Sequence, residues 1–375
     1  MAVLTEEQSM LRDSARTWTQ EKSPVTAFRK VRDAGLPLGY DPAAFAEMAE
    51  MGWTGVIIPE EYGGSDFGYL SLGLVLEETG RTLTASPLLS SALAAASAII
   101  LGGTTAQKEA WLPKIAGGEA VGTLAVDEGP HHNPSKVAVK AAKAGAGYTV
   151  SGAKTFVLEG MAANVFVVSA RTSGAENDKA GISLFLVDAS AKGVSRKALK
   201  LADSRGAANV SFDGAPAELL GEEGKGYELL EKVLDRARAG LAAEMLGSAL
   251  QAFETTLDYL KVRVQFGQVI GSFQALQHRA AKMFTDLELA RSCVEAALTA
   301  IDNNSPDVPE LVSLAKAKMG DTLHLVSNEM VQMHGGIGMT DEHDAGFFIK
   351  RARVAQMTFG TSAYHRNRFA ELHSY

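Results

Sequence analysis

The amino-acid sequence predicts an α+β protein: an N-terminal helical domain, a middle antiparallel β barrel or sandwich, and a C-terminal four-helix bundle. Two changes of pattern along the chain indicate this order. Helix caps and helical spacing of apolar residues cover 1–120, short β-branched runs cover 121–221, and helical spacing returns over 222–375. We therefore expect three domains with these boundaries.

The first domain carries recognisable helix starts. Thr5 is followed three residues later by Gln8, which forms a capping box, and Asp41 precedes Pro42, which places proline at the first helical position. Two more helices are expected within 86–120, each closed by a pair of glycines. These signals predict a bundle of short helices.

The middle domain is built from short apolar runs between turn residues. The runs are VGTLAVDE, SKVAVKAA, GYTVSGAKTFVLEG, NVFVVSART, GISLFLVDA and NVSFDG, with TSGAENDKAG as an exposed loop between two of them. Strands of this length and spacing are typical of a small antiparallel barrel or sandwich.

The last domain contains four long helical stretches. They cover 225–263, 272–303, 308–334 and 343–373, and NNSPDVP and a GGIG turn separate the later ones. Four such stretches predict a helical bundle.

Composition excludes several classes of protein. The content of 46% hydrophobic and 21% charged residues in 375 indicates a folded globular chain. A net charge of -8, without a basic stripe, argues against nucleic acid as a partner. We see no apolar run long enough for a membrane span and no signal peptide, and Cys293 is a single cysteine, so we expect no membrane association and a cytoplasmic location.

Several motifs occur in a fixed order from the first helix to the last residues. They are GWTGVIIPEEYGG at 52–64, LPKIAGGEA at 112–120, RVQFGQVIGSFQALQHRAAKM at 263–283 and QMHGGIGMTDEHDAGFFIKRARV at 332–354, followed by FGTSAYHRN. In combination they resemble the acyl-CoA dehydrogenase family. The resemblance implies FAD extended across a subunit boundary and an acyl-CoA thioester oxidised between its α and β carbons, which requires a carboxylate base and a flavin on opposite faces of the substrate.

The resemblance also implies that the adenine and pyrophosphate end of FAD is held by the neighbouring protomer. The matching residues here are Arg263, Phe266, Gln274, Gln332, Gly335 and Gly336. An arginine can pair with pyrophosphate as a charged fork, and glycines leave room for backbone to approach a cofactor. The alternative for each is structural: Phe266 in the core, the two glutamines solvated, and the two glycines as a helix stop.

The residues that would serve the chain's own flavin ring are altered. Where relatives carry a stretch like TEPxAGSD this chain reads DEGPHHNPSKV at 127–137, and where they carry KxWITN it reads KTFVLE at 154–159. Phe156 keeps an aromatic face, but Leu158 offers no hydroxyl donor. Near the C-terminus Thr361 remains as a candidate phosphate contact, and Ala363 replaces the usual Glu or Gln.

Both family positions for the base are occupied by hydrocarbon. Phe359 stands where most relatives carry Glu, and Ala237 stands where some carry it on a helix. Glu244 is a weak substitute candidate, since it lies seven residues beyond Ala237 on the same helix face; its alternative is a buried carboxylate paired with a basic neighbour. His131 and His132 lack further ligands at metal spacing, so we expect a surface loop and no metal.

Three hypotheses follow from this pattern. The leading one is a subunit of a heteromeric acyl-CoA dehydrogenase that completes a partner's FAD site and lacks the base, acting on a fatty acyl or bulky sterol-type CoA thioester. The second is a homomeric FAD enzyme with an unconventional base, and the third is a non-catalytic assembly scaffold. The expected partners are a second acyl-CoA dehydrogenase-like subunit or another copy of this chain, in a dimer or tetramer, and an electron-transfer flavoprotein-type acceptor.

Overall fold

The computed structural model describes residues 4–145 and 147–375. The chain forms two compact units. The helical unit comprises the residues up to Arg29, Gly73–Thr84 and Arg238–Tyr375, and the barrel unit comprises Lys30–Leu72 and Ala85–Ala237. The predicted order of helical, β and helical segments is confirmed, whereas the three domain boundaries stay a prediction.

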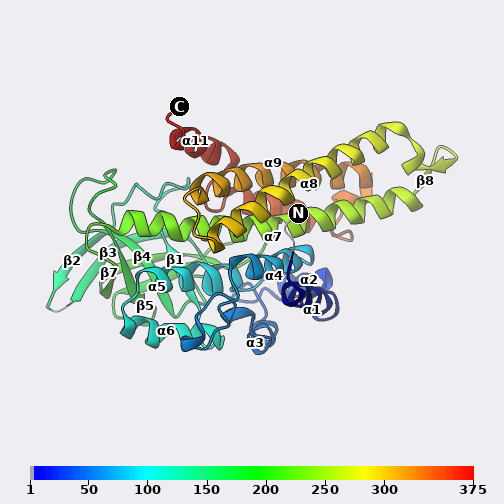
Figure 1. The fold of residues 1–375 in the computed structure, drawn as a ribbon. Helices are drawn as coiled ribbons and strands as arrows, with labels where there is room; N and C mark the ends of the chain where they lie inside the picture. Colours follow the sequence, from blue (N-terminus) through cyan, green and yellow to red (C-terminus); the bar gives the residue numbers. More distant parts are fainter. Residues whose placement is uncertain (1–3, 146) are drawn as a thin grey trace. The chain divides into compact units, whose positions relative to one another are not determined.

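The helical unit is dominated by long helices that lie along one another. Figure 1 shows α8 and α9 beside the C-terminal part of α7, with α10 and α11 following. The bounds are α1 Glu6–Lys22, α8 Gln274–Asp302, α9 Val308–His334, α10 Ala345–Met357 and α11 Ser362–Leu372; α2 (Val25–Ala34), α4 (Tyr69–Arg81) and α7 (Gly226–Val262) contribute in part. The capping box at the start of α1 is confirmed, because Gln8 N donates to Thr5 Oγ1 and Thr5 N donates to Gln8 Oε1.

The last predicted helical stretch is broken. Where the sequence predicts one helix over 343–373, α10 ends at Met357 and α11 begins at Ser362. The reason is local: Phe359 and Gly360 have φ of 56° and 107°, which no α-helix accommodates, and the Thr361 side chain caps α11 by accepting from Tyr364 N.

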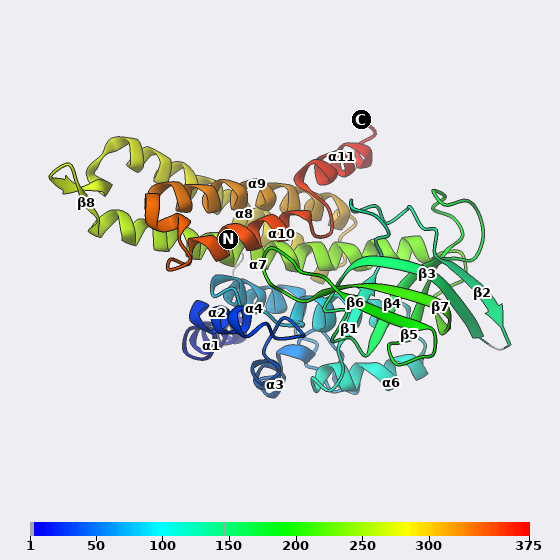
Figure 2. The same ribbon diagram turned by 180° about the vertical axis from the view of Figure 1, so that it is seen from behind.

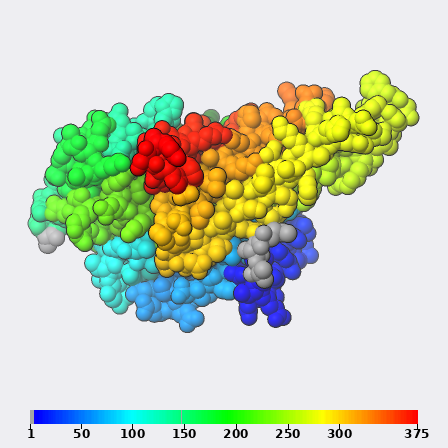
Figure 3. Space-filling view, turned by 45° about the horizontal axis from the view of Figure 1, so that its top comes forward, coloured from blue at the N-terminus to red at the C-terminus, as the bar shows by residue number. Residues whose placement is uncertain are grey.

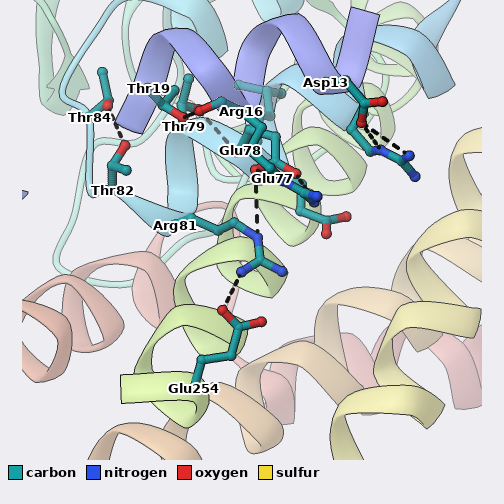
Figure 4. A network of polar contacts seen from close by, with 12 residues as sticks. Asp13, Arg16, Thr19, Glu77, Glu78, Thr79, Arg81, Thr82, Thr84 and Glu254 are labelled. Carbon is teal, nitrogen blue, oxygen red and sulfur yellow. Dashed lines mark hydrogen bonds and ion pairs between the residues drawn. The ribbon is translucent and has the colours of Figure 1, made fainter. Parts of the chain in front are cut away.

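A buried polar network ties α1 to the rest of the helical unit (Figure 4). Nη2 of Arg16 on α1 lies 2.8 Å from Oε1 of Glu78 on α4, and Glu78 is 1% exposed. Arg81 continues the network to Glu254 on α7 at 2.9 Å. The backbones approach closely here, because a Cβ on Gly247 would lie 1.7 Å from a carbonyl oxygen of α4. Only glycine fits at this crossing.

A short hairpin joins α7 to α8. It comprises β8 (Val264–Gln265), β9 (Gln268–Val269) and the 3₁₀ turn η4 (Ile270–Ser272). Figure 3 shows this hairpin standing out from the ends of α7 and α8. A second 3₁₀ turn, η5 (Gly335–Met339), follows α9.

The barrel unit contains a sheet that closes on itself (Figure 2). The ring runs β4–β5–β7–β3–β2 and back to β4, while β1 pairs with β4 and β6 pairs with β7. The bounds are β1 Gly122–Ala125, β2 Lys140–Ala144, β3 Gly147–Leu158, β4 Val165–Arg171, β5 Ile182–Asp188, β6 Val194–Ala198 and β7 Ala207–Leu220. The strand pattern predicts an antiparallel barrel, and most pairings are antiparallel. The β1–β4 and β2–β4 pairings, however, are parallel. Long connections separate these strands in sequence and permit parallel pairing.

Aromatic and β-branched residues fill the barrel. Phe166 and Phe212 meet edge to face with their ring centroids 6.1 Å apart, and every residue of β4 is buried. The core includes Val150, Val157, Phe166, Val168, Phe185, Val187, Val210 and Phe212.

Short helices complete the barrel unit. The bounds are α3 Pro42–Glu50, η1 Trp53–Gly55, η2 Glu60–Tyr62, η3 Leu88–Ala95, α5 Ala96–Gly102 and α6 Thr105–Ala116. Asp41 caps α3 by accepting from Ala43 N at 2.9 Å, as predicted. The helix predicted to begin near residue 86 starts as a π-helix in η3 and becomes α-helical at Ala96. None of the helices in the described ranges combines the length and apolar composition needed to cross a bilayer.

Candidate functional site

The residues predicted to hold the adenine side of FAD lie on the surface of the helical unit. Arg263 follows the end of α7, and Gln274 is the first residue of α8; both are exposed. Phe266, at the tip of the hairpin, is 90% exposed. A phenyl ring this exposed is not part of the chain's own core, so the structural alternative for Phe266 is wrong. The hairpin presents an apolar face and a guanidinium to whatever lies outside the chain.

Gly335 and Gly336, which follow α9, have no atoms packed where a side chain would extend from either residue. Gly335 has φ 64° and ψ −137°, a conformation reserved largely for glycine, and it ends α9. A Cβ on Gly335 or on Gly336 would meet nothing within 4 Å. Gln332, one turn earlier, is exposed. The pair is therefore a helix stop and also borders open space.

An aromatic stack that the sequence did not predict holds this end of α9. The rings of Tyr259 and His334 stack with centroids 4.3 Å apart, and the Tyr259 hydroxyl donates to the His334 carbonyl at 3.3 Å. Burial lowers the pKa of His334, which keeps the ring neutral. The stack fixes the point at which Gly335 leaves the helix.

The turn that carries Phe359 is gripped by buried basic side chains. The Phe359 carbonyl accepts from Arg238 Nε at 3.3 Å and from His365 Nε2 at 3.0 Å. Lys316 Nζ donates to the Gly360 carbonyl at 3.0 Å and to the Ala355 carbonyl at 3.2 Å. These contacts hold residue 359 in its left-handed conformation although its side chain is hydrocarbon.

Burial controls the protonation of this cluster. Burial, together with the positive charges of Arg238 and Arg351, lowers the pKa of Lys316 to about 7. Burial and the same Arg238 charge also lower the pKa of His365, so this ring is neutral and donates through Nε2. Sequence reasoning missed both residues; the one available signal was a lysine on the otherwise apolar face of the third long helix.

No carboxylate occupies either family position for the base. Phe359 contributes a phenyl ring, and Ala237 contributes a buried methyl group on α7. Glu244 is 5% exposed, and its Oε1 accepts from Nε and Nη2 of Arg351 at 2.9 and 2.8 Å. Glu244 is therefore a buried carboxylate paired with a basic neighbour, which is the alternative to its role as a base given in the sequence analysis.

The altered loop of the barrel unit satisfies its own acids. Asp127 accepts from His132 Nδ1 at 2.9 Å and from Asn133 N at 3.1 Å. Glu128 accepts from Lys154 Nζ at 2.7 Å and from Ala138 N at 2.8 Å. These carboxylates use their hydrogen-bonding capacity within the chain.

The two histidines of this loop behave differently. His131 is exposed, as expected of a surface loop, but the His132 side chain is only 4% exposed, because its ring binds Asp127. The expectation of a surface loop is therefore wrong for His132. Within the described ranges, no group of three or more His, Cys, Asp or Glu is arranged to hold a metal ion.

The KTFVLE segment is likewise bonded internally. Phe156 is half-buried with φ 53°, and its amide donates to Asn209 Oδ1 at 3.4 Å. The Leu158 carbonyl accepts from the Thr123 hydroxyl at 2.7 Å. Thr361, in the helical unit, uses its side-chain oxygen to cap α11. It thus has a structural role in addition to any contact with phosphate.

Three family models match consecutive parts of the chain. They are described as acyl-CoA dehydrogenase N-terminal domain over residues 5–119, middle domain over 127–214 and C-terminal domain over 224–372. The chain belongs to the acyl-CoA dehydrogenase family. Members of this family are FAD-dependent flavoprotein oxidoreductases that act on acyl-CoA.

Similar proteins cover nearly the whole chain. Acryloyl-CoA reductase (NADH) of Anaerotignum propionicum is 32% identical over 97% of this chain and 93% of its own length. The structure of the Tcur3481-Tcur3483 steroid ACAD is 31% identical with a TM-score of 0.90, covering 98% of each chain. The ChsE4-ChsE5 complex from Mycobacterium tuberculosis is 25% identical with a TM-score of 0.91, covering 100% of this chain and 99% of the other.

The residues of this chain suit the adenine half of an FAD site. On the adenine side, an exposed guanidinium, an exposed aromatic face and open space at two glycines suit a ligand arriving from outside the helical unit. On the ring side, the loop acids and the amide of Phe156 are already bonded within the barrel unit. These groups are therefore already committed to hydrogen bonds within the chain.

Proposed function

We propose that this chain is a subunit of a heteromeric acyl-CoA dehydrogenase that completes the FAD site of an unlike partner and does not carry the base. The observation that carries the proposal is the turn at Phe359. Its backbone is held by Arg238 and His365, yet its side chain has no titratable group. Removal of the α proton of an acyl-CoA thioester needs such a group.

The division between the two halves of the cofactor site supports a role in trans. Arg263 would pair with the pyrophosphate of FAD, Phe266 would pack on its adenine side, and Gln274 and Gln332 would bond its polar atoms. Gly335 and Gly336 would let the cofactor approach the backbone, and Thr361 would add a phosphate contact. When bound, FAD supplies the acceptor for the hydride that leaves the thioester.

Two similar structures support an assembly of unlike chains. Both the Tcur3481-Tcur3483 steroid ACAD and the ChsE4-ChsE5 complex carry two chain names. By analogy, the substrate proposed here is a bulky CoA thioester such as a sterol-type side chain, and an electron-transfer flavoprotein-type protein is the proposed acceptor. Analogy of this kind gives the class of substrate, and the identity of the acyl group depends on the partner's pocket.

The decisive experiment compares the chain alone with the chain purified beside an acyl-CoA dehydrogenase-like partner that retains a glutamate at the position matching Phe359. We expect the chain alone to be colourless and the complex to show flavin absorbance and acyl-CoA dehydrogenation. A yellow, active chain alone would establish the homomeric alternative with an unconventional base. A complex without flavin would establish the scaffold alternative.

A pair of variants tests the contribution in trans. Arg263→Ala should lower the flavin content of the complex, because one charge on the pyrophosphate is lost. Lys261→Ala is the matched control, since Lys261 pairs with exposed Asp258 at the end of the same helix. Equal flavin content in the two variant complexes would contradict the role given to Arg263.

A further inference from the structure

A groove of about 440 Å³ crosses three strands of the barrel unit, β3, β7 and β6. Its lining includes Ala153, Thr155, Ser195, Lys197, Asn209 and Ser211. Val210 and Phe212, which alternate with the lining residues of β7, are buried in the barrel. Lys154, which is also buried, and its partner Glu128 border the groove. The groove therefore lies on the outer face of the sheet.

The register of the strands explains why this face is hollow. Ser211 on β7 is paired with Ala153 on one side and with Ser195 on the other. Three small side chains thus lie side by side across three strands. Two residues along β7, Asn209 is paired with Lys197, and these longer side chains bound the hollow.

The groove presents hydrogen-bond donors that the chain itself does not use. Asn209 Oδ1 accepts from Thr155 Oγ1 at 2.7 Å and from Phe156 N, which leaves its amide nitrogen as a donor. The side chains of Ser195, Ser211 and Lys197 make no hydrogen bond or ion pair with any described residue. Two hydroxyls, one amide and one ammonium group therefore line the groove on the neighbouring strands β6 and β7.

The charge of the groove is positive. Glu128 lies at its edge, but this carboxylate is compensated by Lys154 Nζ at 2.7 Å. Arg196 also borders the groove, with its guanidinium donating to the Ala163 carbonyl at 3.0 Å, and carries no acidic partner among the described residues. The charges of Lys197 and Arg196 thus remain uncompensated at the rim.

We propose that this groove binds the phosphate group of a small molecule through Lys197, Ser195, Ser211 and Asn209. Four donors on two paired strands suit the three terminal oxygens of a phosphate, whereas a carboxylate offers two oxygens. The volume is within the range of small-molecule sites, so an ester of modest size fits beside its phosphate. The four donors are not among the residues given above for the adenine side of FAD. Glu128, Lys154 and Thr155 at the edge of the groove belong to the segments 127–137 and 154–159, which the resemblance places at the flavin ring.

Calorimetric titration of the full chain tests the proposal with two probes, inorganic phosphate and glycerol 3-phosphate. We expect saturable binding that weakens about tenfold in Lys197→Ala, because a charged hydrogen bond is removed. Ser211→Val should also weaken binding by filling the hollow, with an unchanged melting temperature as evidence of folding. Tighter binding of the ester assigns an organic phosphate, and equal binding assigns the free anion.

Lys192→Ala is the matched control. Lys192 is exposed in the turn before β6 and does not line the groove. Its removal changes the net charge by the same amount, so it reports the non-specific attraction of anions. Absence of saturable binding in the unaltered protein, or an equal loss in Lys197→Ala and Lys192→Ala, would overturn the proposal.

Discussion

Arg351 holds Glu244 in a buried ion pair: Nε and Nη2 of the guanidinium lie 2.9 and 2.8 Å from one carboxylate oxygen. A carboxylate so placed stabilises the fold, and its removal leaves a buried charge without its partner. We therefore expect Glu244→Gln to lower the free energy of unfolding by about 3 kcal/mol. Urea denaturation monitored by circular dichroism measures this change.

The same pair offers its own control. The double variant Glu244→Leu with Arg351→Met removes both charges, and it should recover most of the stability that Glu244→Gln loses. In the complex with a partner, dehydrogenation should survive in Glu244→Gln at temperatures where it is folded. Loss of dehydrogenation with unchanged stability and flavin content would identify Glu244 as the base instead.

Lys316 makes stability depend on pH. Burial lowers its pKa in the folded state to about 7, from an ordinary value of 10.5. Between these values the unfolded chain binds one more proton than the folded chain, so stability rises with pH. The free energy of unfolding rises by at most about 1.4 kcal/mol per pH unit. This gain is lost as pH falls toward 7.

Lys316→Met isolates this effect from the other titrating groups. We expect the free energy of unfolding of the unaltered protein, minus that of the variant, to increase from pH 7 to pH 10. Lys318→Met serves for comparison, because Lys318 is a partly exposed neighbour paired with Asp286 on α8. A difference that stays flat with pH would show that Lys316 keeps its proton in the folded chain.

Substitutions at Gly335 and Gly336 distinguish the effect of backbone strain from the effect of steric crowding by a side chain. Neither position is crowded, but only Gly335 has positive φ. Gly335→Ala should therefore destabilise the chain by about 1–2 kcal/mol, while Gly336→Ala should leave thermal stability nearly unchanged. Under the proposed function, both variants lower the flavin content of the complex. A loss of stability in Gly336→Ala would point to a contact within this chain.

The sequence predicts those parts of the structure that depend on neighbours in the chain. The caps at Thr5 and Asp41 are local, since each bonds backbone amides two or three residues away. The break near Phe359 was missed because helical spacing continues on both sides of it, and two of the residues that stabilise the turn, Arg238 and Lys316, are distant in sequence.

Long-range partners account for the rest. Lys316 reaches the Gly360 carbonyl from 44 positions away, and Glu244 meets Arg351 across 107. His132 is a local exception: its ring is buried against Asp127, five residues away in an irregular loop that no helix or strand pattern describes. The parallel pairing of β1 with β4 likewise depends on how the barrel closes.

Glu78 and Glu254 test how much burial contributes to the network that binds α1 (Figure 4). Both carboxylates lie near Arg81, but the side chain of Glu78 is 1% exposed and that of Glu254 is 49% exposed. Glu78→Gln leaves Arg16 and Arg81 without a buried counter-charge, so we expect a loss of about 3 kcal/mol in the free energy of unfolding. Glu254→Gln removes a solvated pair and should cost under about 1 kcal/mol. Chemical denaturation at low and high salt measures both. Equal losses would mean that Arg81 anchors the network through the exposed carboxylate, with Glu78 adding nothing beyond its packing.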